Sequence, residues 1–340
     1  MKLVIQIPCL NEEASLPITL AGLPRALPGI DVIEVVVIDD GSTDKTVDVA
    51  RRMGVDHVVV LPRHQGLAGA FRVGLETSLM LGADIIVNTD GDNQYDARDL
   101  ESLVLPILEG RADLVVGDRQ VQGIRHFSAV KKLLHRLGDG VMERLSGIEL
   151  FDSTSGFRAY SREAALRLNV FSKFTYTLET LIQAGKKNLT VAHVPVRVNG
   201  KLRESRLFPG LWFYLKRSAS TMVRIYAMYE PLKVFSYLGA LVSGTGAVLV
   251  LRFLYYFLTS QGPVGKLQSV LTGVTLIAMG LLLGLIGIVS DLIAANRQVV
   301  EDIQYRIRRM ELGGDMAAGE RREDAAAGST RPTAVAGRNT

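Results

Sequence analysis

The stretch "IIVNTDGDNQYD" places Asp90, Asp92 and Asp96 directly after an apolar run. Carboxylates this close repel one another unless a positive charge lies among them. Asp90 and Asp92 flank Gly91, so their side chains converge only on something bound above the end of the run. Mg²⁺ or Mn²⁺ takes oxygen ligands and often completes its shell with substrate phosphates. An isolated Asp-x-Asp is a weak signal, but its place at a strand end predicts a divalent-metal site.

A second acidic pair, Asp39 and Asp40, ends another apolar run in "DDGSTDKT". Gly41 turns the chain, and Ser42 or Thr43 can cap the helix that follows. Capping explains the hydroxyl residues but not two adjacent acids. Adjacent carboxylates at a strand end suit recognition of a ribose or of a base N–H group.

Two further segments follow apolar runs. In "PCLNEE", Asn11 is a candidate helix N-cap with Glu12 and Glu13 in the first turn, and capping alone explains these residues. In "RHQGLAGA", small residues from Gly66 onward let a helix N-terminus approach a ligand or a neighbouring strand. Neither segment is a dinucleotide fingerprint, since no Gly-x-Gly-x-x-Gly follows a strand and no Walker lysine occurs.

Alternating strands and helices must position these residues. The runs "LVIQIP", "IEVVVIDD", "HVVVLP", "DIIVNTD" and "ADLVVGD" are typical of strands buried on both faces of a parallel or mostly parallel sheet. This alternation predicts a Rossmann-like α/β domain with ligands at the carboxyl ends of the strands. The helices expected between the strands are Glu12 to Leu27, Thr43 to Arg52, Leu67 to Leu81 and Arg98 to Glu109.

Two long apolar stretches follow, from Leu232 to Leu258 and from Leu267 to Ile293. A membrane-spanning helix needs roughly 20 apolar residues, and both stretches satisfy this. A pair of buried core helices is the alternative, although globular helices seldom stay apolar on every side for so long. Arg252 is the one misfit, and it lies where an arginine can extend to the interface.

Basic residues flank the two spans on the side of the chain termini, whereas the loop "TSQGPVGK" holds one lysine. The positive-inside rule therefore predicts a multi-pass cell-membrane protein with both termini and the catalytic domain in the cytoplasm. No signal peptide precedes the first strand. The single cysteine, Cys9, suits a reducing compartment and is expected to be a buried apolar residue. The net charge of +4 and the five scattered histidines indicate neither nucleic-acid binding nor a zinc site.

Six motifs, in order, resemble those of family 2 glycosyltransferases of the GT-A fold: "PCLNEE", "DDGSTDKT", "HQGLAGA", "TDGDNQYD", "VVGDR" and "TSGFRAY". The nearest subgroup is the dolichol-phosphate mannosyltransferase-like, or polyprenyl-phosphate glycosyltransferase, enzymes. The resemblance covers Lys2 to Pro231. It implies inverting transfer of a sugar from a nucleotide-diphosphate sugar to the phosphate of a membrane polyprenol, dolichyl or undecaprenyl.

The resemblance also implies site residues. Asp39 and Asp40 would hold the nucleoside. Mg²⁺ or Mn²⁺ on the diphosphate would be held by Asp90, Asp92 and Gln94. The full set expected at the donor site is Pro8, Asn11, Glu12, Asp39, Asp40, Gly66, Asp90, Gly91 and Asp92.

The acceptor end departs from the family pattern. An Arg followed by Gly-x-Ser-Lys is common there, whereas this chain has "KLRESRLF", so Arg203 and Ser205 match better than Arg206. A phosphate monoester is already ionised at neutral pH and needs cations rather than a base. Glu179 is a candidate base or a partner for these cations, and the expected catalytic residues are Asp90, Asp92, Arg119 and Glu179. The candidates for gripping the acceptor phosphate are Arg119, Arg125, Lys131, Lys132, Arg158, Arg203 and Ser205.

Two other functions compete with this one. A processive polysaccharide synthase needs a pore and carries a Gln-x-x-Arg-Trp motif, whereas Trp212 is not preceded by arginine and two spans make a poor channel. A catalytically inactive membrane anchor would bind nucleotide only, but Asp39, Asp90, Asp92 and Arg119 occur together. The sequence leaves the donor open between GDP-mannose and a UDP-hexose.

The expected organisation has four parts along the 340 residues. A catalytic domain, 1–205, precedes amphipathic helices at 206–231 that suit the headgroup plane. Two membrane helices at 232–295 follow, and they could support a homo-oligomer. The last part, 296–340, is expected to be a helix end and a disordered tail from about Leu312, since bulky apolar residues are almost absent there.

Overall fold

The computed structural model describes residues 1–120, 138–144, 146–148, 152–171, 176–200, 216, 220, 223–224, 226–259 and 267–328. Contacts divide the chain into two units. Unit 1 comprises Met1–Arg206 with Ile303–Thr340, and unit 2 is Leu207–Asp302.

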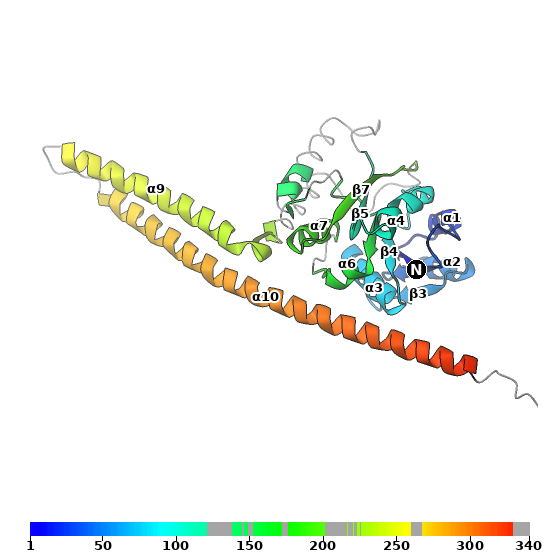
Figure 1. Ribbon diagram of the computed structural model, residues 1–340. Helices are drawn as coiled ribbons and strands as arrows, with labels where there is room; N and C mark the ends of the chain where they lie inside the picture. Colours follow the sequence, from blue (N-terminus) through cyan, green and yellow to red (C-terminus); the bar gives the residue numbers. More distant parts are fainter. Residues whose placement is uncertain are drawn as a thin grey trace, which may run out of the picture. The chain divides into compact units, whose positions relative to one another are not determined.

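Unit 1 is built on a seven-stranded sheet in the order β3-β2-β1-β4-β6-β5-β7 (Figure 1). Only β6 runs antiparallel to its neighbours; the other pairs are parallel. The predicted mostly parallel α/β sheet is therefore confirmed, with all five expected strands present. The strand bounds are β1 Lys2–Cys9, β2 Val32–Asp39, β3 His57–Val60, β4 Ile85–Asn88, β5 Leu114–Asp118, β6 Arg158–Ser161 and β7 Val191–Pro195.

Strand β1 lies at the point where the strand order reverses, with β2 on one side and β4 on the other. Its residues Leu3, Ile5 and Ile7 are fully buried in the main core cluster. A crevice forms at the carboxyl ends of strands at such a reversal, and α/β proteins bind ligands there. The carboxyl ends of β1, β2, β4 and β5 all lie at this edge, because these strands share one direction.

Helices flank the sheet in the order expected (Figure 1). The largest departure is α1, which occupies Leu16–Gly22 instead of Glu12 to Leu27. Asn11 has a φ of 55°, which turns the chain before the helix can begin, and Leu23 is already extended. The other helices of this unit are α2 Thr46–Arg52, α3 Leu67–Met80, η1 Ala97–Asp99, α4 Leu100–Leu108, α6 Arg162–Arg167 and α7 Thr177–Lys186.

In unit 2, helix α9, Pro231–Thr259, lies beside the first part of α10, Leu267–Gly328 (Figure 1). Both are long and apolar enough to cross a membrane, with a mean hydropathy of 1.9 over an 18-residue stretch of α9 and of 2.4 over one within Leu267–Leu312. Glycines bring the two backbones close together. A Cβ added at Gly239 would lie 2.7 Å from the Gly280 carbonyl oxygen, and one at Gly246 would lie 2.5 Å from that of Gly273. Small residues allow this approach between apolar helices, where lipid gives no hydrophobic drive.

Helix α10 continues to Gly328, into the segment for which the composition predicts a disordered tail from Leu312. The abundant Ala, Glu and Arg residues there are strong helix formers, which accounts for the difference. The part of α10 from Ile303 onward belongs to unit 1. The Tyr305 hydroxyl donates to Glu163 at 2.8 Å, and the Arg308 guanidinium donates to Asn169 at 3.1 Å.

A pair of truncations tests which part of α10 stabilises unit 1. Ending the chain after Asp302 removes the Tyr305 and Arg308 contacts, whereas ending it after Leu312 keeps them. We expect the first truncation to lower the unfolding midpoint by several degrees, at roughly 2–4 °C per kcal/mol for a domain of this size. The second should leave the midpoint unchanged. Equal midpoints in a thermal melt of the detergent-solubilised proteins would contradict the prediction.

Candidate active site

The Asp39 carboxylate lies at the end of β2 and is 1% exposed. Its Oδ2 accepts the backbone N–H groups of Gly41 at 3.2 Å and Ser42 at 3.1 Å. Its Oδ1 is buried and has no hydrogen-bond partner among the residues that the structure describes. A buried carboxylate oxygen is normally hydrogen-bonded, so this one is suited to a donor group of a ligand.

Asp40, the next residue, binds the loop that precedes α3. Its Oδ1 accepts the Gln65 N–H at 2.7 Å and its Oδ2 accepts the Gly66 N–H at 2.9 Å. The His64 Nδ1 lies 2.9 Å from the same Oδ2. Because both oxygens bind the loop before α3, Asp40 fixes that loop and the position of Gly66, whose φ is 83°. Direct contact between Asp40 and the nucleoside stays a prediction, and the structure gives Asp40 this additional role.

Asn11 joins two loops instead of capping α1, which is a correction. Its N–H donates to the Ser42 hydroxyl, and its Oδ1 accepts the Thr43 N–H, both at 2.8 Å. Ser15 precedes α1, without a side-chain capping bond. The carboxyl ends of β1 and β2 are thus tied together beside Asp39.

Two other residues expected at the donor site also lie at this edge. Glu12 is 7% exposed, and its carboxylate accepts the Ser15 hydroxyl at 2.5 Å. Pro8 is buried near the end of β1. Cys9, the next residue, is 2% exposed and belongs to the core cluster, which confirms its role as a buried apolar residue.

Asp90 and Asp92 lie in the loop that follows β4. Burial, together with the charges of Asp92 and Glu12 and against the opposing charge of Arg119, raises the pKa of Asp90 to about 7. These four side chains therefore share one electrostatic environment, in which negative charge exceeds positive charge. A Cβ added at Gly91 would lie 2.9 Å from the Cys9 sulfur, so only glycine fits between the two acids.

Asp90 and Asp92 can supply two oxygen ligands to a cation. Among the described residues, no group of three or more His, Cys, Asp or Glu side chains is arranged to hold a metal. A cation at Asp90 and Asp92 would thus need further oxygens, from Gln94 or from a bound phosphate. Two carboxylates completed by substrate phosphates is a common arrangement for Mg²⁺.

Arg119 follows β5 and supplies the positive charge that the acidic cluster needs. Its Nε and one terminal nitrogen grip the Asp152 carboxylate at 2.6 and 2.9 Å, and that nitrogen also donates to the Thr154 hydroxyl at 2.7 Å. The Asp152 side chain is fully buried. Burial lowers the pKa of Arg119, but Tyr95, Asp152 and Asp90 outweigh burial and raise it, so the guanidinium stays charged.

The segment around Gly156 completes the site. No local sequence pattern predicts its contacts with Asn88, Asp90 and Tyr95. A Cβ added at Gly156 would lie 2.9 Å from the Asp90 Oδ2. The Gly156 N–H donates to the Tyr95 hydroxyl at 3.0 Å, and its carbonyl accepts the Asn88 side-chain amide at 2.8 Å. The motif "TSGFRAY" includes Gly156, but its contacts are with residues far away in the sequence. Tyr95 precedes Gly156 by 61 residues.

Arg158 does not hold an acceptor phosphate, contrary to expectation. The side chain is 0% exposed. Its guanidinium donates to the carbonyls of Ser153, Ser155 and Thr177 and to the Thr180 hydroxyl, at 2.8–2.9 Å. A guanidinium that is enclosed and bound in this way holds the polypeptide together and leaves no face for a substrate.

Glu179 is also enclosed, in α7, with 0% exposure. Its Oε1 accepts the Phe171 N–H at 3.1 Å. This geometry contradicts a role as a base that contacts substrate. Arg125, Lys131, Lys132, Arg203, Ser205 and Arg206, expected near the acceptor, lie outside the described residues.

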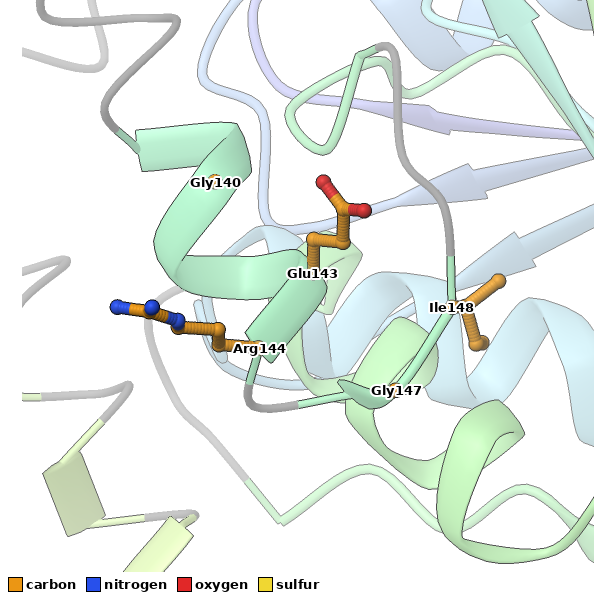
Figure 2. A pocket seen from close by; sticks show the side chains of 5 residues that line it. All are labelled: Gly140, Glu143, Arg144, Gly147 and Ile148. Carbon is orange, nitrogen blue, oxygen red and sulfur yellow. The ribbon is translucent and has the colours of Figure 1, made fainter.

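A cavity of about 480 Å³ lies away from the strand ends just described (Figure 2). Gly140, Glu143, Arg144, Gly147 and Ile148 line it. The side chains of Glu143 and Arg144 point in different directions from their helix (Figure 2). Among its described lining residues, Glu143 and Arg144 are the charged ones and they do not converge, so the candidate site rests on the acids at the strand ends.

Comparison with known proteins agrees with this geometry. Residues 4–168 match the model of the glycosyl transferase family 2 domain. The undecaprenyl-phosphate mannosyltransferase of Micrococcus luteus is 29% identical over 222 residues, which cover 62% of this chain and 89% of that protein. The dolichyl-phosphate hexose transferase of Haloferax volcanii is 30% identical over 203 residues, covering 58% and 83%.

A solved structure shows the same fold. Glucosyl-3-phosphoglycerate synthase from Mycobacterium tuberculosis, in complex with Mn²⁺, UDP and glucosyl-3-phosphoglycerate, superposes with a TM-score of 0.52 at 23% identity. The match covers 66% of this chain and 78% of that one. The sheet, the acids at its carboxyl edge and the sequence matches agree, and the chain is a member of glycosyl transferase family 2.

Proposed function

We propose that this glycosyltransferase moves a hexose from a nucleoside-diphosphate sugar, GDP-mannose or a UDP-hexose, to the phosphate of a membrane polyprenol. An oxygen of the acceptor phosphate forms the new bond to C1 of the sugar. The bond from C1 to the diphosphate breaks, and the nucleoside diphosphate leaves with the electron pair. Attack from the opposite face inverts the anomeric centre.

The unpartnered Asp39 oxygen supports the donor half of the proposal. It lies at the end of β2, and the acids at the end of β4 lie across the adjacent strand β1. We propose that Asp39 binds a hydroxyl or N–H group of the nucleoside. The diphosphate would then lie toward Asp90 and Asp92.

The gathering of Asp90, Asp92, Glu12 and Arg119 just beyond the end of β4 is the single observation that carries the proposal furthest. The resemblance to the family implies that the diphosphate binds at this position. Asp90 and Asp92, with Gln94, would hold Mg²⁺ or Mn²⁺, which when bound neutralises charge developing on the leaving diphosphate. The chain's own part is to orient the two carboxylates and to keep Arg119 beside them.

The acceptor half rests on the lipid-facing part of the chain and on the relatives. Two helices are apolar enough to cross a membrane, and the two relatives described above are named for undecaprenyl and dolichyl phosphates. A phosphate acceptor needs no base to ionise it, which agrees with the enclosure of Glu179. We place the catalytic unit on the cytoplasmic side, from the basic flanks of the spans.

A transfer assay with defined substrates tests the proposal. The purified full chain in detergent is incubated with undecaprenyl phosphate and either GDP-mannose, UDP-glucose or UDP-N-acetylglucosamine, with Mn²⁺ or Mg²⁺. We expect one donor to yield a polyprenyl-phosphate hexose by mass spectrometry. Sugar transfer to soluble acceptors alone, with none to the lipid phosphate, would overturn the proposal.

The metal assignment predicts a pH dependence. The Asp90 pKa of about 7 lies above its ordinary 3.8, so the folded metal-free protein retains a proton that the unfolded chain loses. The stabilisation is full below about pH 4 and is lost as the pH rises through about 7, at up to about 1.4 kcal/mol per pH unit. Because a cation must displace that proton, Mn²⁺ affinity should rise with pH and level off above about pH 7.

The measurement is a Mn²⁺ titration with a thermal melt at each pH. Asp90→Asn is the matched variant, because it keeps the shape and cannot titrate. It should remove the part of the pH dependence of the metal-free midpoint that Asp90 contributes between about pH 4 and about pH 7. A parent protein whose Mn²⁺ affinity does not change between about pH 5.5 and about pH 7 would contradict the prediction.

A further inference from the structure

A short antiparallel ribbon holds the loop that carries Asp92. Tyr95 pairs with Val198 in an isolated bridge. The Asp96 N–H donates to the Arg197 carbonyl at 3.2 Å, and the Asn199 N–H donates to the Gln94 carbonyl at 2.9 Å. The segment after β7 therefore lies along the loop after β4. Tyr95 and Asn199, which are in contact here, are 104 residues apart in the sequence.

Asn199 holds the loop at three points. Its side-chain amide nitrogen donates to the carbonyl of Asn93 at 3.1 Å and to that of Tyr95 at 3.2 Å. Together with its backbone N–H, this one residue binds three successive carbonyls, those of Asn93, Gln94 and Tyr95. Two carbonyl acceptors require the NH₂ end of the amide, so an aspartate of the same shape cannot replace it.

The loop held in this way has an uncommon backbone conformation. Asn93 has a φ of 55°, in the left-handed region that non-glycine residues seldom occupy. Such a conformation persists where surrounding contacts determine it, and it concentrates at functional sites. The bonds from Asn199 act on the carbonyls of Asn93 and of its two successors.

Contacts link Asn199 to the Asp92 carboxylate through one intervening residue. The Gln94 N–H donates to the Asp92 Oδ1 at 3.1 Å, and the Gln94 carbonyl accepts the Asn199 N–H at 2.9 Å. We propose that Asn199 is a positioning residue that orients the Asp92 carboxylate toward the metal and diphosphate by holding the Asn93–Tyr95 turn. This inference rests on the proposed function, because it takes Asp92 to be a metal ligand.

The same ribbon provides a control for stability alone. Arg197 binds Asp99 through its backbone N–H and through Nε, at 2.6 and 2.9 Å. Among the residues that the structure describes, the Arg197 side chain makes no hydrogen bond to the carbonyls of Asn93–Tyr95. Arg197→Ala thus weakens the ribbon but leaves the bonds of Asn199 in place.

The test uses the full chain in detergent and the electron paramagnetic resonance signal of free Mn²⁺, with UDP or GDP present. We expect Asn199→Ala to weaken Mn²⁺ binding about tenfold, as changes to residues behind metal ligands commonly do. Its kcat should fall and partly recover at high Mn²⁺, with the KM for the lipid unchanged. Asn199→Ser keeps one side-chain donor, so its Mn²⁺ affinity should lie between those of the parent and Asn199→Ala. It replaces Asn199→Ala in the test if that variant does not fold. Arg197→Ala should lower the melting midpoint and keep Mn²⁺ affinity.

Asp92→Asn separates failure of this inference from failure of the proposed function. If Asp92→Asn abolishes Mn²⁺ binding and the Asn199 variants bind it as the parent does, the positioning role is overturned. If Mn²⁺ affinity falls equally in Arg197→Ala and Asn199→Ala, the effect is ribbon stability and the role is also overturned. If Asp92→Asn itself binds Mn²⁺ normally, the metal assignment under the proposed function fails, and the role of Asn199 fails with it.

Discussion

Asp92→Asn should lower sugar transfer by about 10²- to 10³-fold while the protein remains folded. The substitution keeps the shape of the side chain and removes one of the two charges that would hold the metal. Losing one preorganised charge-stabilising group in a catalytic site commonly costs this much in kcat. The measurement is kcat/KM for transfer in Mn²⁺, beside a thermal melt without metal.

The melt separates a functional loss from a structural one. The Asp92 charge helps to raise the pKa of Asp90, so its removal relieves repulsion in the metal-free protein. The metal-free variant should be at least as stable as the parent at neutral pH. Turnover close to that of the parent in either Mg²⁺ or Mn²⁺ would rule out Asp92 as a metal ligand.

Asp96→Asn is the matched control, since it is the same substitution four residues further along the loop. Asp96 is bound by the Arg98 side chain, and this hydrogen bond lowers the pKa of Asp96 to about 2. Its carboxylate is occupied with arginine rather than directed at Asp90. We expect transfer to stay within about twofold of the parent, because asparagine keeps an oxygen for the Arg98 backbone N–H and the ion pair that is lost has an exposed partner, the Arg98 side chain.

The sheet could be predicted because its strands are runs of Val, Ile and Leu between turn residues. The runs at β1 and β4 and the second half of β2 are buried on both faces, as in parallel sheets. The antiparallel β6, Arg158–Ser161, carried no such signal. It has four residues and includes an arginine and a serine, so neither its length nor its composition distinguishes it from a loop.

The acids of the site could be predicted because each follows its strand directly. What each carboxylate binds could not, because its partners come from other loops. Asp39 and Asp40 are neighbours, yet one has an unpartnered oxygen and the other is bound to the Gln65 and Gly66 N–H groups. The partners of Arg158 could not be predicted either. Arginine is mostly exposed in proteins, but the fold encloses Arg158 with four oxygen acceptors.

Arg119→Ala should reduce both stability and transfer, and the two losses have separate causes. Asp152 is fully buried, so removing the arginine takes its two-pronged ion pair away from a buried carboxylate, at a cost of about 3–5 kcal/mol. Transfer should fall roughly ten- to a hundredfold beyond the loss of folded protein, since a charge-assisted contact to phosphate contributes about 1.5–3 kcal/mol. Arg119→Lys should recover only part of this, because an ammonium group cannot reproduce the two-pronged grip.

A double variant isolates the contribution to catalysis. Asp152→Asn, added to Arg119→Ala, removes the negative charge of the buried side chain and keeps an oxygen for the Thr154 N–H and hydroxyl, which Asp152 binds at 3.3 and 3.1 Å. We expect it to regain most of the stability and none of the transfer, with nucleotide-sugar affinity retained in separate titrations. Recovery of transfer together with stability would reduce Arg119 to a structural role. Loss of nucleotide-sugar affinity with normal lipid-phosphate kinetics would assign Arg119 to the donor, because the acceptor contact would then be intact without it.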